Sequence, residues 1–201
     1  MFVPPRFAQT DRAECLALIE RAPFGLLVTG GEDAPFATHL PFLLERRGDE
    51  AVLIGHVARA NPHWRNFDEC RQALAVFQGP HGYISPAWYA TPDRVPTWNY
   101  IAVHAYGAPC LVDAPDAARS VIAALTARFE SGREAPWSMA GLSERELEKL
   151  MSALVVFEMP VTRLEGKWKL GQHMAEADRL GAVAGLAREG GDPALAAAMK
   201  P

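Results

Sequence analysis

The stretch VPTWNYIAVHAYG, residues 95–107, has the composition of a β-strand but carries an unusual series of polar and aromatic side chains. Its second half alternates Ile101, Val103 and Ala105, as expected of a strand with one buried face. The polar and aromatic members are Thr97, Trp98, Asn99, Tyr100 and His104. A strand interior is usually apolar or β-branched, so these groups need a partner other than an ordinary core.

Outward from this stretch, short apolar runs separated by Gly, Pro and Asp predict further strands. The predicted strands cover residues 24–30, 35–45, 51–58, 73–79, 97–113 and 155–170, the last as one strand or two. Residues 80–96 hold four prolines and are predicted to form an ordered loop or a bulged edge, because Pro removes ladder donors. Residues 61–72 are polar and predict a loop or a short helix.

Helices are predicted where capping residues precede an apolar stripe. Asp11 and Glu14 open a helix that ends before Pro23, residues 116–130 form a second, and Ser143 with Glu146 caps a third over 143–154. A terminal helical hairpin follows over 174–201, with a Gly-Gly break and a second helix opened by Asp192. The pattern predicts a single domain over 1–201 of the α+β, mainly β class: a barrel with inserted helices over 1–173, then the hairpin.

Composition restricts the class of protein. The 201 residues include 49% apolar and 22% charged side chains, as in an ordinary globular domain. No apolar run approaches the length of a membrane span and the first residues do not resemble a signal peptide, so we expect a cytoplasmic protein without membrane contact. The net charge of −4 does not support nonspecific DNA binding, although it allows a local basic patch. Cys15, Cys70 and Cys110 are widely spaced and predict reduced, mostly buried thiols.

Familiar catalytic motifs are absent from the sequence. It contains no phosphate-binding P-loop, no GxGxxG, no GxSxG and no HExxH. His56 and His63 lack a nearby third ligand, so no metal site is predicted.

Aromatic and hydrogen-bonding residues concentrate instead in four segments: THLP, GHVARANPHW, HGYISPAWY to VPTWNY, and GKWKLGQH. Taken singly, most of these residues are expected to be structural. Taken together, apolar walls, amides, hydroxyls and cations are what a flat aromatic cofactor with a phosphate requires.

Six stretches carry a resemblance to a known family: PFATHLPFLL, GHVARANPHW, FQGPHGYISPAWY, VPTWNYIAVHAYG, FEMPVTRLEGKWKLGQ and DRLGAVAGL. Together they resemble the PaiB family of FMN-binding negative transcriptional regulators, over essentially the whole chain. The resemblance implies a split β-barrel like that of pyridoxamine phosphate oxidases and flavin reductases. It also implies a homodimer with FMN in a groove between the subunits.

The resemblance, with the chemistry of the side chains, assigns candidate FMN contacts. Arg59, Lys167 and Lys169 are the cations for the phosphate. The other candidates are Thr38, His39, His56, Asn61, Thr97, Trp98, Asn99, Tyr100 and Gln172, as hydrogen-bonding groups or as walls of the ring. This chain reads KLGQH where family members usually read KLSQN, so Gly171 and His173 replace a hydroxyl and an amide of a predicted site loop.

Three functions follow from these expectations. The first is a homodimeric FMN-binding negative regulator of transcription. The second is an FMN-dependent oxidoreductase or flavin reductase for a small substrate, with His39, His56 or His104 as proton donors. The third is a dimeric interaction module without flavin. Direct DNA contact would need a basic surface, and the one helix-turn-helix candidate, 175–199, is followed only by Lys200.

Overall fold

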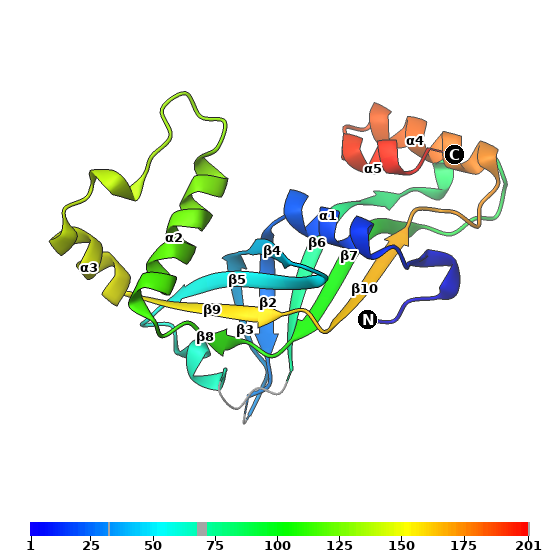
Figure 1. Cartoon of the computed structure of the whole chain (residues 1–201). Coiled ribbons are helices and arrows are strands. Elements are labelled where there is room, and N and C mark those ends of the chain that lie inside the picture. The colour runs from blue at the N-terminus through cyan, green and yellow to red at the C-terminus, as the bar shows by residue number, and fades with distance from the viewer. Residues whose placement is uncertain (32, 68–71, 201) are drawn as a thin grey trace. The chain divides into compact units, whose positions relative to one another are not determined.

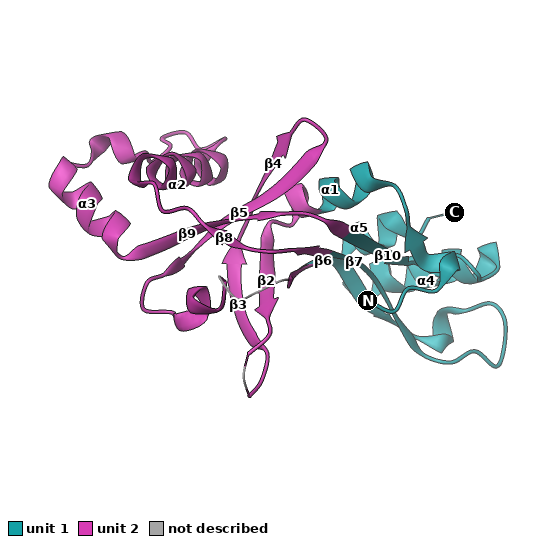
Figure 2. Ribbon diagram, turned by 60° about the horizontal axis from the view of Figure 1, so that its bottom comes forward, with its two compact units in different colours: residues 1–18, 77–104, 164–201 teal, residues 19–76, 105–163 magenta. Residues whose placement is uncertain are grey.

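The chain folds into two compact units, each built from segments that are distant in sequence (Figures 1 and 2). The structure is a computed structural model that describes residues 1–31, 33–67 and 72–200. Unit 1 consists of residues 1–18, 77–104 and 164–201. Unit 2 consists of residues 19–76 and 105–163. The prediction of one domain over 1–201 stays a prediction.

Unit 1 contains a sheet in the strand order β1-β10-β7-β6. The strands are β1 (Ala8–Gln9), β10 (Arg163–Lys169), β7 (Thr97–Gly107) and β6 (Ala73–Ile84), and the first residues of β6 and the last of β7 belong to unit 2. Most of α1 (Arg12–Arg21) also lies in unit 1, after the 3₁₀ helix Pro5–Phe7. The Asp11 side chain accepts the Ala13 N–H at 2.7 Å, which confirms the predicted N-cap.

The C-terminal hairpin completes unit 1. It consists of α4 (Glu176–Arg188) and α5 (Pro193–Ala198), and the Asp192 carboxylate accepts the Ala194 N–H at 2.8 Å. A 3₁₀ helix, Pro86–Trp88, precedes an irregular segment that leads into β7. The predicted helix–break–helix is confirmed.

Unit 2 contains two sheet segments. Within it, β6 pairs with β2 (Phe24–Thr29), which pairs with β3 (Phe36–Pro41), and a second sheet has the order β4-β5-β9-β8. The second sheet consists of β4 (Leu43–Arg47), β5 (Glu50–Ala58), β9 (Leu154–Pro160) and β8 (Cys110–Leu111). Its helical elements are α2 (Pro115–Glu130), α3 (Glu144–Ser152) and the 3₁₀ helices Pro62–Asn66 and Met139–Gly141.

Aromatic packing fills the core of unit 2. Phe157 lies 5.0 Å from Phe67 and 6.3 Å from Phe42 between ring centroids, both edge-on, and all three rings are buried. A Cβ at Gly55 would lie 2.9 Å from the Phe157 ring and 2.7 Å from Leu40. This close approach accounts for the glycine in the middle of β5.

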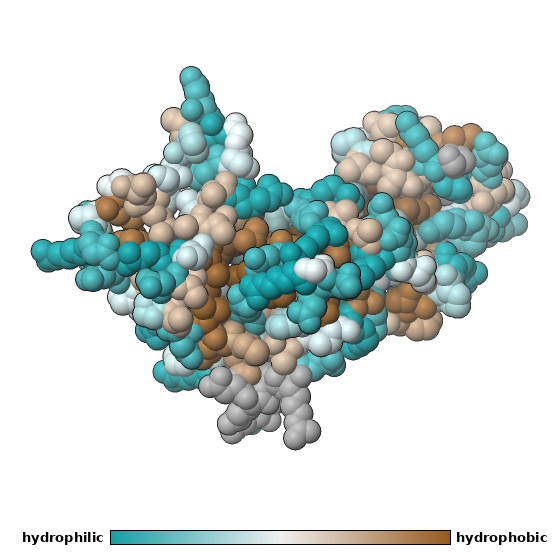
Figure 3. Space-filling view, viewed as in Figure 1, coloured by the Kyte–Doolittle hydropathy of each residue, from teal (hydrophilic) through white to brown (hydrophobic). Residues whose placement is uncertain are grey.

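Helix α3 begins where the capping box was predicted. The Ser143 hydroxyl accepts the Glu146 N–H, and the Glu146 carboxylate accepts the Ser143 N–H at 2.9 Å. Leu147 is the one buried residue of α3. Hydrophilic residues accordingly cover most of its visible surface in Figure 3.

Four predictions need correction. Residues 97–113 form two strands, β7 and β8, which belong to different sheets. Residues 35–45 form two strands, because the chain leaves one sheet and enters the other at the buried Phe42. Strand β6 continues through Pro80 to Ile84, where an ordered loop or a bulged edge was predicted. Its pairing with β2 involves Leu74–Val76, so the missing N–H of Pro80 costs no bond to β2. Cys110 is exposed rather than buried; Cys15 is buried, and Cys70 lies outside the described residues.

Within the described part of the chain, no helix combines the length and the apolar composition needed to cross a bilayer.

Candidate functional site

Two lysines of β10 lie close to the first residues of β7 in unit 1. Lys167 and Lys169 are two positions apart, so their side chains leave the same face of the strand. The Lys167 ammonium donates to the Phe2 carbonyl at 3.1 Å and lies 5.1 Å from the centroid of the Tyr100 ring. The Lys169 ammonium donates to the Thr97 hydroxyl and, at 2.8 Å, to the Trp98 carbonyl.

These two ammonium groups have no carboxylate partner among the described residues. Lys167 is only 9% exposed, although a buried lysine is normally paired. Burial lowers the pKa of Lys169; Tyr100 opposes this shift and the Lys167 charge adds to it. Two neighbouring cations that have no carboxylate partner in the described part of the chain are suited to an anionic ligand.

The first residues of β7 alternate in burial. Trp98 is 56% exposed and packs edge-on against Tyr83 at 6.1 Å, whereas Asn99 is 2% exposed. The Asn99 amide donates to the Met199 sulfur at 3.4 Å, so this donor is used inside unit 1. Strand alternation therefore separates Asn99 from Trp98 and Tyr100, which the sequence analysis had grouped.

A tight turn follows β10. Gly171 has a φ of 82°, in the left-handed region that favours glycine. The Gln172 side chain accepts the Leu170 N–H at 2.9 Å and donates to the Trp168 carbonyl, so its amide ties the turn to the end of β10. The departure from KLSQN at position 171 is thus explained by backbone conformation.

A buried histidine organises the candidate residues of unit 2. His63 is fully buried; its Nδ1 lies 2.8 Å from the Thr38 hydroxyl and its Nε2 lies 3.0 Å from the Thr29 hydroxyl. The side-chain amide of Asn61 donates to the Thr38 hydroxyl oxygen at 3.1 Å. The side-chain oxygen of Asn61 accepts the backbone N–H of His63. Burial lowers the pKa of His63 to about 4, so the ring is neutral at pH 7.

Both hydroxyls that contact the His63 ring also accept from an amide. Thr38 accepts from Asn61 at 3.1 Å and Thr29 from Asn66 at 3.5 Å, so the neutral ring donates to one hydroxyl and accepts from the other. The sequence pattern had suggested His63 only as a metal ligand, and this structural role was not predicted. The local signal was Asn61 two residues earlier, whose side chain caps the 3₁₀ helix Pro62–Asn66.

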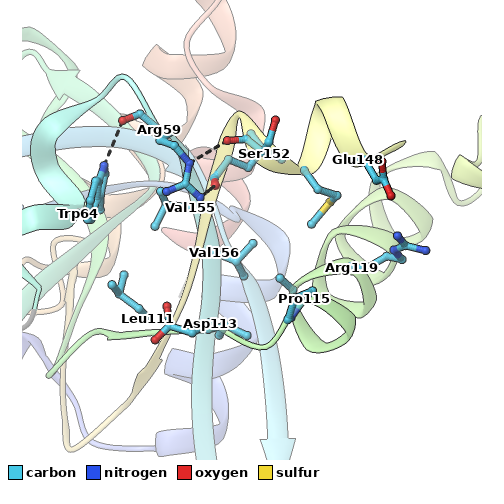
Figure 4. A pocket seen from close by; sticks show the side chains of 14 residues that line it. Arg59, Trp64, Leu111, Asp113, Pro115, Arg119, Glu148, Ser152, Val155 and Val156 are labelled. Atoms are coloured by element: carbon cyan, nitrogen blue, oxygen red, sulfur yellow. Dashed lines mark hydrogen bonds between the residues drawn. The ribbon is translucent and has the colours of Figure 1, made fainter. Parts of the chain in front are cut away.

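Arg59 is the first residue after β5; its side chain reaches the end of α3 and lines a cavity of about 390 Å³ in unit 2 (Figure 4). Its Nε donates to the Ser152 carbonyl at 2.8 Å and its Nη2 to the Leu154 carbonyl at 2.9 Å. Its own carbonyl accepts the Trp64 indole N–H at 3.1 Å. The Arg59 guanidinium was expected to bind the phosphate. Two of its donors instead bind the carbonyls of Ser152, the last residue of α3, and of Leu154, the first residue of β9.

The two remaining histidines of unit 2 differ in environment. His39 is exposed on β3 and stacks on Phe24 with ring centroids 6.2 Å apart. His56 lies on β5, and its buried Nδ1 has no hydrogen-bond partner among the described residues. Burial lowers the pKa of His56, so this ring is also expected to be neutral.

Comparison with known proteins places the chain in a family. A family model described as "Putative FMN-binding domain" matches residues 1–163. The "Protease synthase and sporulation protein PAI 2" of Bacillus subtilis is 35% identical over 189 residues, which cover 94% of this chain and 90% of the Bacillus protein. The chain belongs to the PaiB family of FMN-binding domain proteins.

Two solved structures share the PaiB fold seen here. The FAD and heme binding protein of Mycobacterium smegmatis matches with a TM-score of 0.60 and 22% identity, over 81% of this chain and 73% of the other. The flavocytochrome Anf3 of Azotobacter vinelandii matches with a TM-score of 0.61 and 16% identity, over 81% of this chain and 69% of the other. The predicted split-barrel fold is confirmed, with open sheets formed by the described strands.

FMN is the cofactor of PaiB-family proteins, and unit 1 of this chain fits its phosphate. The ammonium groups of Lys167 and Lys169 lack a carboxylate partner among residues 1–31, 33–67 and 72–200, and Thr97 adds a hydroxyl. Exposed Trp98 and half-buried Tyr100 supply aromatic surface beside them.

The predicted FMN contacts thus form two groups. The structure brings Thr97, Trp98 and Tyr100 together with the two lysines in unit 1, and Thr38 with Asn61 in unit 2. Gln172, Asn99 and Arg59 instead spend donors on the protein itself. That both groups hold one cofactor stays a prediction.

Proposed function

We propose that the protein is a homodimeric, FMN-binding negative regulator of transcription of the PaiB type, acting in the cytoplasm. The observation that carries FMN binding is the pair of lysines on β10 without a carboxylate partner in the described chain. Family membership supports the cofactor, and the PaiB resemblance supports the regulatory role.

In this proposal Lys167, Lys169 and Thr97 bind the phosphate, while Trp98 and Tyr100 border the flavin ring. The remaining contacts are Thr38, His39, His56, Arg59 and Asn61 in unit 2, Asn99 on β7, and Gln172 in the turn after β10. Of these, Arg59 has only its remaining donors free for a ligand. Bound FMN would supply redox chemistry of its own, and the protein would position it.

Titration of the purified protein with FMN and with riboflavin, followed by quenching of flavin fluorescence, tests the phosphate site. Lys167→Ala and Lys169→Ala should each weaken FMN about tenfold or more, because each removes a charge-assisted contact, and should change riboflavin little. Lys149→Ala, on the exposed face of α3, is the matched control. Equal losses for FMN and riboflavin would contradict the assignment.

Two further measurements test the regulator. Light scattering should give the mass of a dimer. A mobility-shift titration with the upstream DNA of the protein's own gene tests direct repression, which predicts a salt-sensitive complex. No shift at micromolar protein would exclude direct DNA binding and leave repression through another protein.

The oxidoreductase hypothesis is tested with the same preparation. Oxidation of NADH or NADPH in the presence of FMN should not exceed the rate with free FMN if the protein is a regulator. A faster rate would favour the enzyme.

A further inference from the structure

The segment between β6 and β7, residues 85–96, is held by the C-terminal hairpin. The Trp88 ring covers Gly185 of α4 so closely that a Cβ there would lie 2.2 Å from Trp88 Cδ2. A Cβ at Gly181, one turn earlier, would lie 2.1 Å from the Trp88 carbonyl oxygen. The Trp88 indole donates to Glu189 at 3.0 Å. The motif SPAWY therefore packs on the motif DRLGAVAGL, which explains the spacing of the two glycines.

A buried carboxylate of α4 also holds this segment, beginning at Thr91, three residues after Trp88. Asp178 of α4 has 0% exposure; its Oδ1 accepts the Thr91 N–H at 2.8 Å and its Oδ2 accepts from Arg94 at 3.3 Å. A carboxylate is costly to bury unless it is paired and hydrogen-bonded, and these are the contacts that compensate it.

Little else holds this part of the segment. Residues 92–96 are all exposed, so no apolar core fixes their conformation. Asp93, between the two residues that Asp178 binds, has a φ of 60°, a conformation that costs a non-glycine residue about 1 kcal/mol or more. Such a conformation persists only where its neighbours are held, and here Asp178 holds them.

The held segment leads directly into the phosphate site. It ends at Thr97, whose hydroxyl, with the Trp98 carbonyl, receives the Lys169 ammonium. The same hairpin also contacts Asn99, two residues after Thr97, because the Met199 sulfur accepts from the Asn99 amide. The position of Thr97, and through it of Lys169, therefore depends on the hairpin on both sides.

We propose that Asp178 is a positioning residue for the FMN phosphate, acting through residues 91–97 on Thr97 and Lys169. This inference rests on the proposed FMN site. It assigns a binding role to the hairpin, which lies beyond the residues 1–163 that the family model matches. Asp178 itself touches no ligand in this proposal.

The test compares affinities for FMN and riboflavin in Asp178→Ala, Asp178→Asn and Glu176→Ala. Asp178→Ala should lower the affinity for FMN about tenfold, because residues 91–97 must then become ordered when FMN binds. The ratio of FMN affinity to riboflavin affinity should fall by a similar factor. Asp178→Asn keeps an acceptor for the Thr91 N–H and should recover most of that loss. Glu176→Ala removes an exposed carboxylate from the same first turn of α4 and should change neither affinity.

A second variant disturbs the hairpin contact from the other end. In Gly185→Ala the added methyl group would clash with the Trp88 ring. This variant should therefore lower the FMN-over-riboflavin ratio, as Asp178→Ala does. Amide hydrogen exchange on both variants should become faster over residues 89–98 and stay unchanged in β5 and β9. A loss of global stability alone would speed exchange in β5 and β9 as well, and it would leave the FMN-over-riboflavin ratio unchanged.

The outcomes separate the two proposals. If the wild-type protein binds FMN and Asp178→Ala binds it with an unchanged ratio over riboflavin, the positioning role is wrong and the FMN site stands. If the wild-type protein binds no FMN, the proposed function fails, and the positioning role fails with it.

Discussion

Lowering the pH should destabilise this protein through His63. The ring is neutral in the folded state because burial lowers its pKa to about 4, whereas an unfolded histidine has a pKa near 6.5. The unfolded state therefore binds more protons below pH 6.5, so stability is complete above that pH and is lost as the pH falls toward 4. The two pKa values give a loss of about 2 kcal/mol at pH 5 and about 3 kcal/mol once both states are protonated.

The structure explains why protonation is unfavourable. A doubly protonated ring would carry a positive charge at a side chain with 0% exposure, and burial disfavours the charged form. Its ring nitrogens contact the hydroxyls of Thr29 and Thr38, which are neutral and offer a buried cation no opposite charge.

Urea unfolding at pH 7.5 and pH 5, with His63→Gln as the control, measures this effect. The quantity compared is the change in unfolding free energy between the two pH values, so a lower starting stability of the variant cancels. The wild-type protein should lose about 2 kcal/mol more than His63→Gln, and other titrating groups, His56 among them, should contribute equally to both. The same loss in both proteins would refute a neutral, buried His63.

Three further changes have defined expected effects on unfolding free energy. Gly171→Ser should cost about 1 kcal/mol because φ is 82°, and Gly171→Asn should cost less; equal stability of the serine variant would mean that the turn relaxes. Phe157→Ala should cost about 4 kcal/mol, because it leaves a cavity in the aromatic core of unit 2, and a cost below about 1 kcal/mol would show that this core collapses around the gap. Ser143→Ala should cost about 1 kcal/mol through loss of the α3 cap, with Ser143→Thr close to wild type; indistinguishable unfolding of the alanine and threonine variants would exclude a role for the cap.

The sequence was sufficient where an interaction spans only a few residues. Asp11, Ser143 and Asp192 each accept a backbone N–H two or three residues ahead, so their helices could be predicted from local pattern. Strand alternation likewise predicted the buried half of β7. The family resemblance was also visible in contiguous motifs, and it implied the split barrel and FMN that the comparisons support.

Only the tertiary structure decided how the candidate side chains are used. Arg59 bonds carbonyls more than ninety residues away, and Asp178 binds Thr91 across 87 residues. Such contacts depend on which strands and helices become neighbours in the fold. The sequence alone does not show whether the donors of a side chain bind a ligand or another part of the protein. For Lys167 the decisive fact is equally non-local: the folded chain buries the ammonium and supplies a carbonyl but no carboxylate within the described residues.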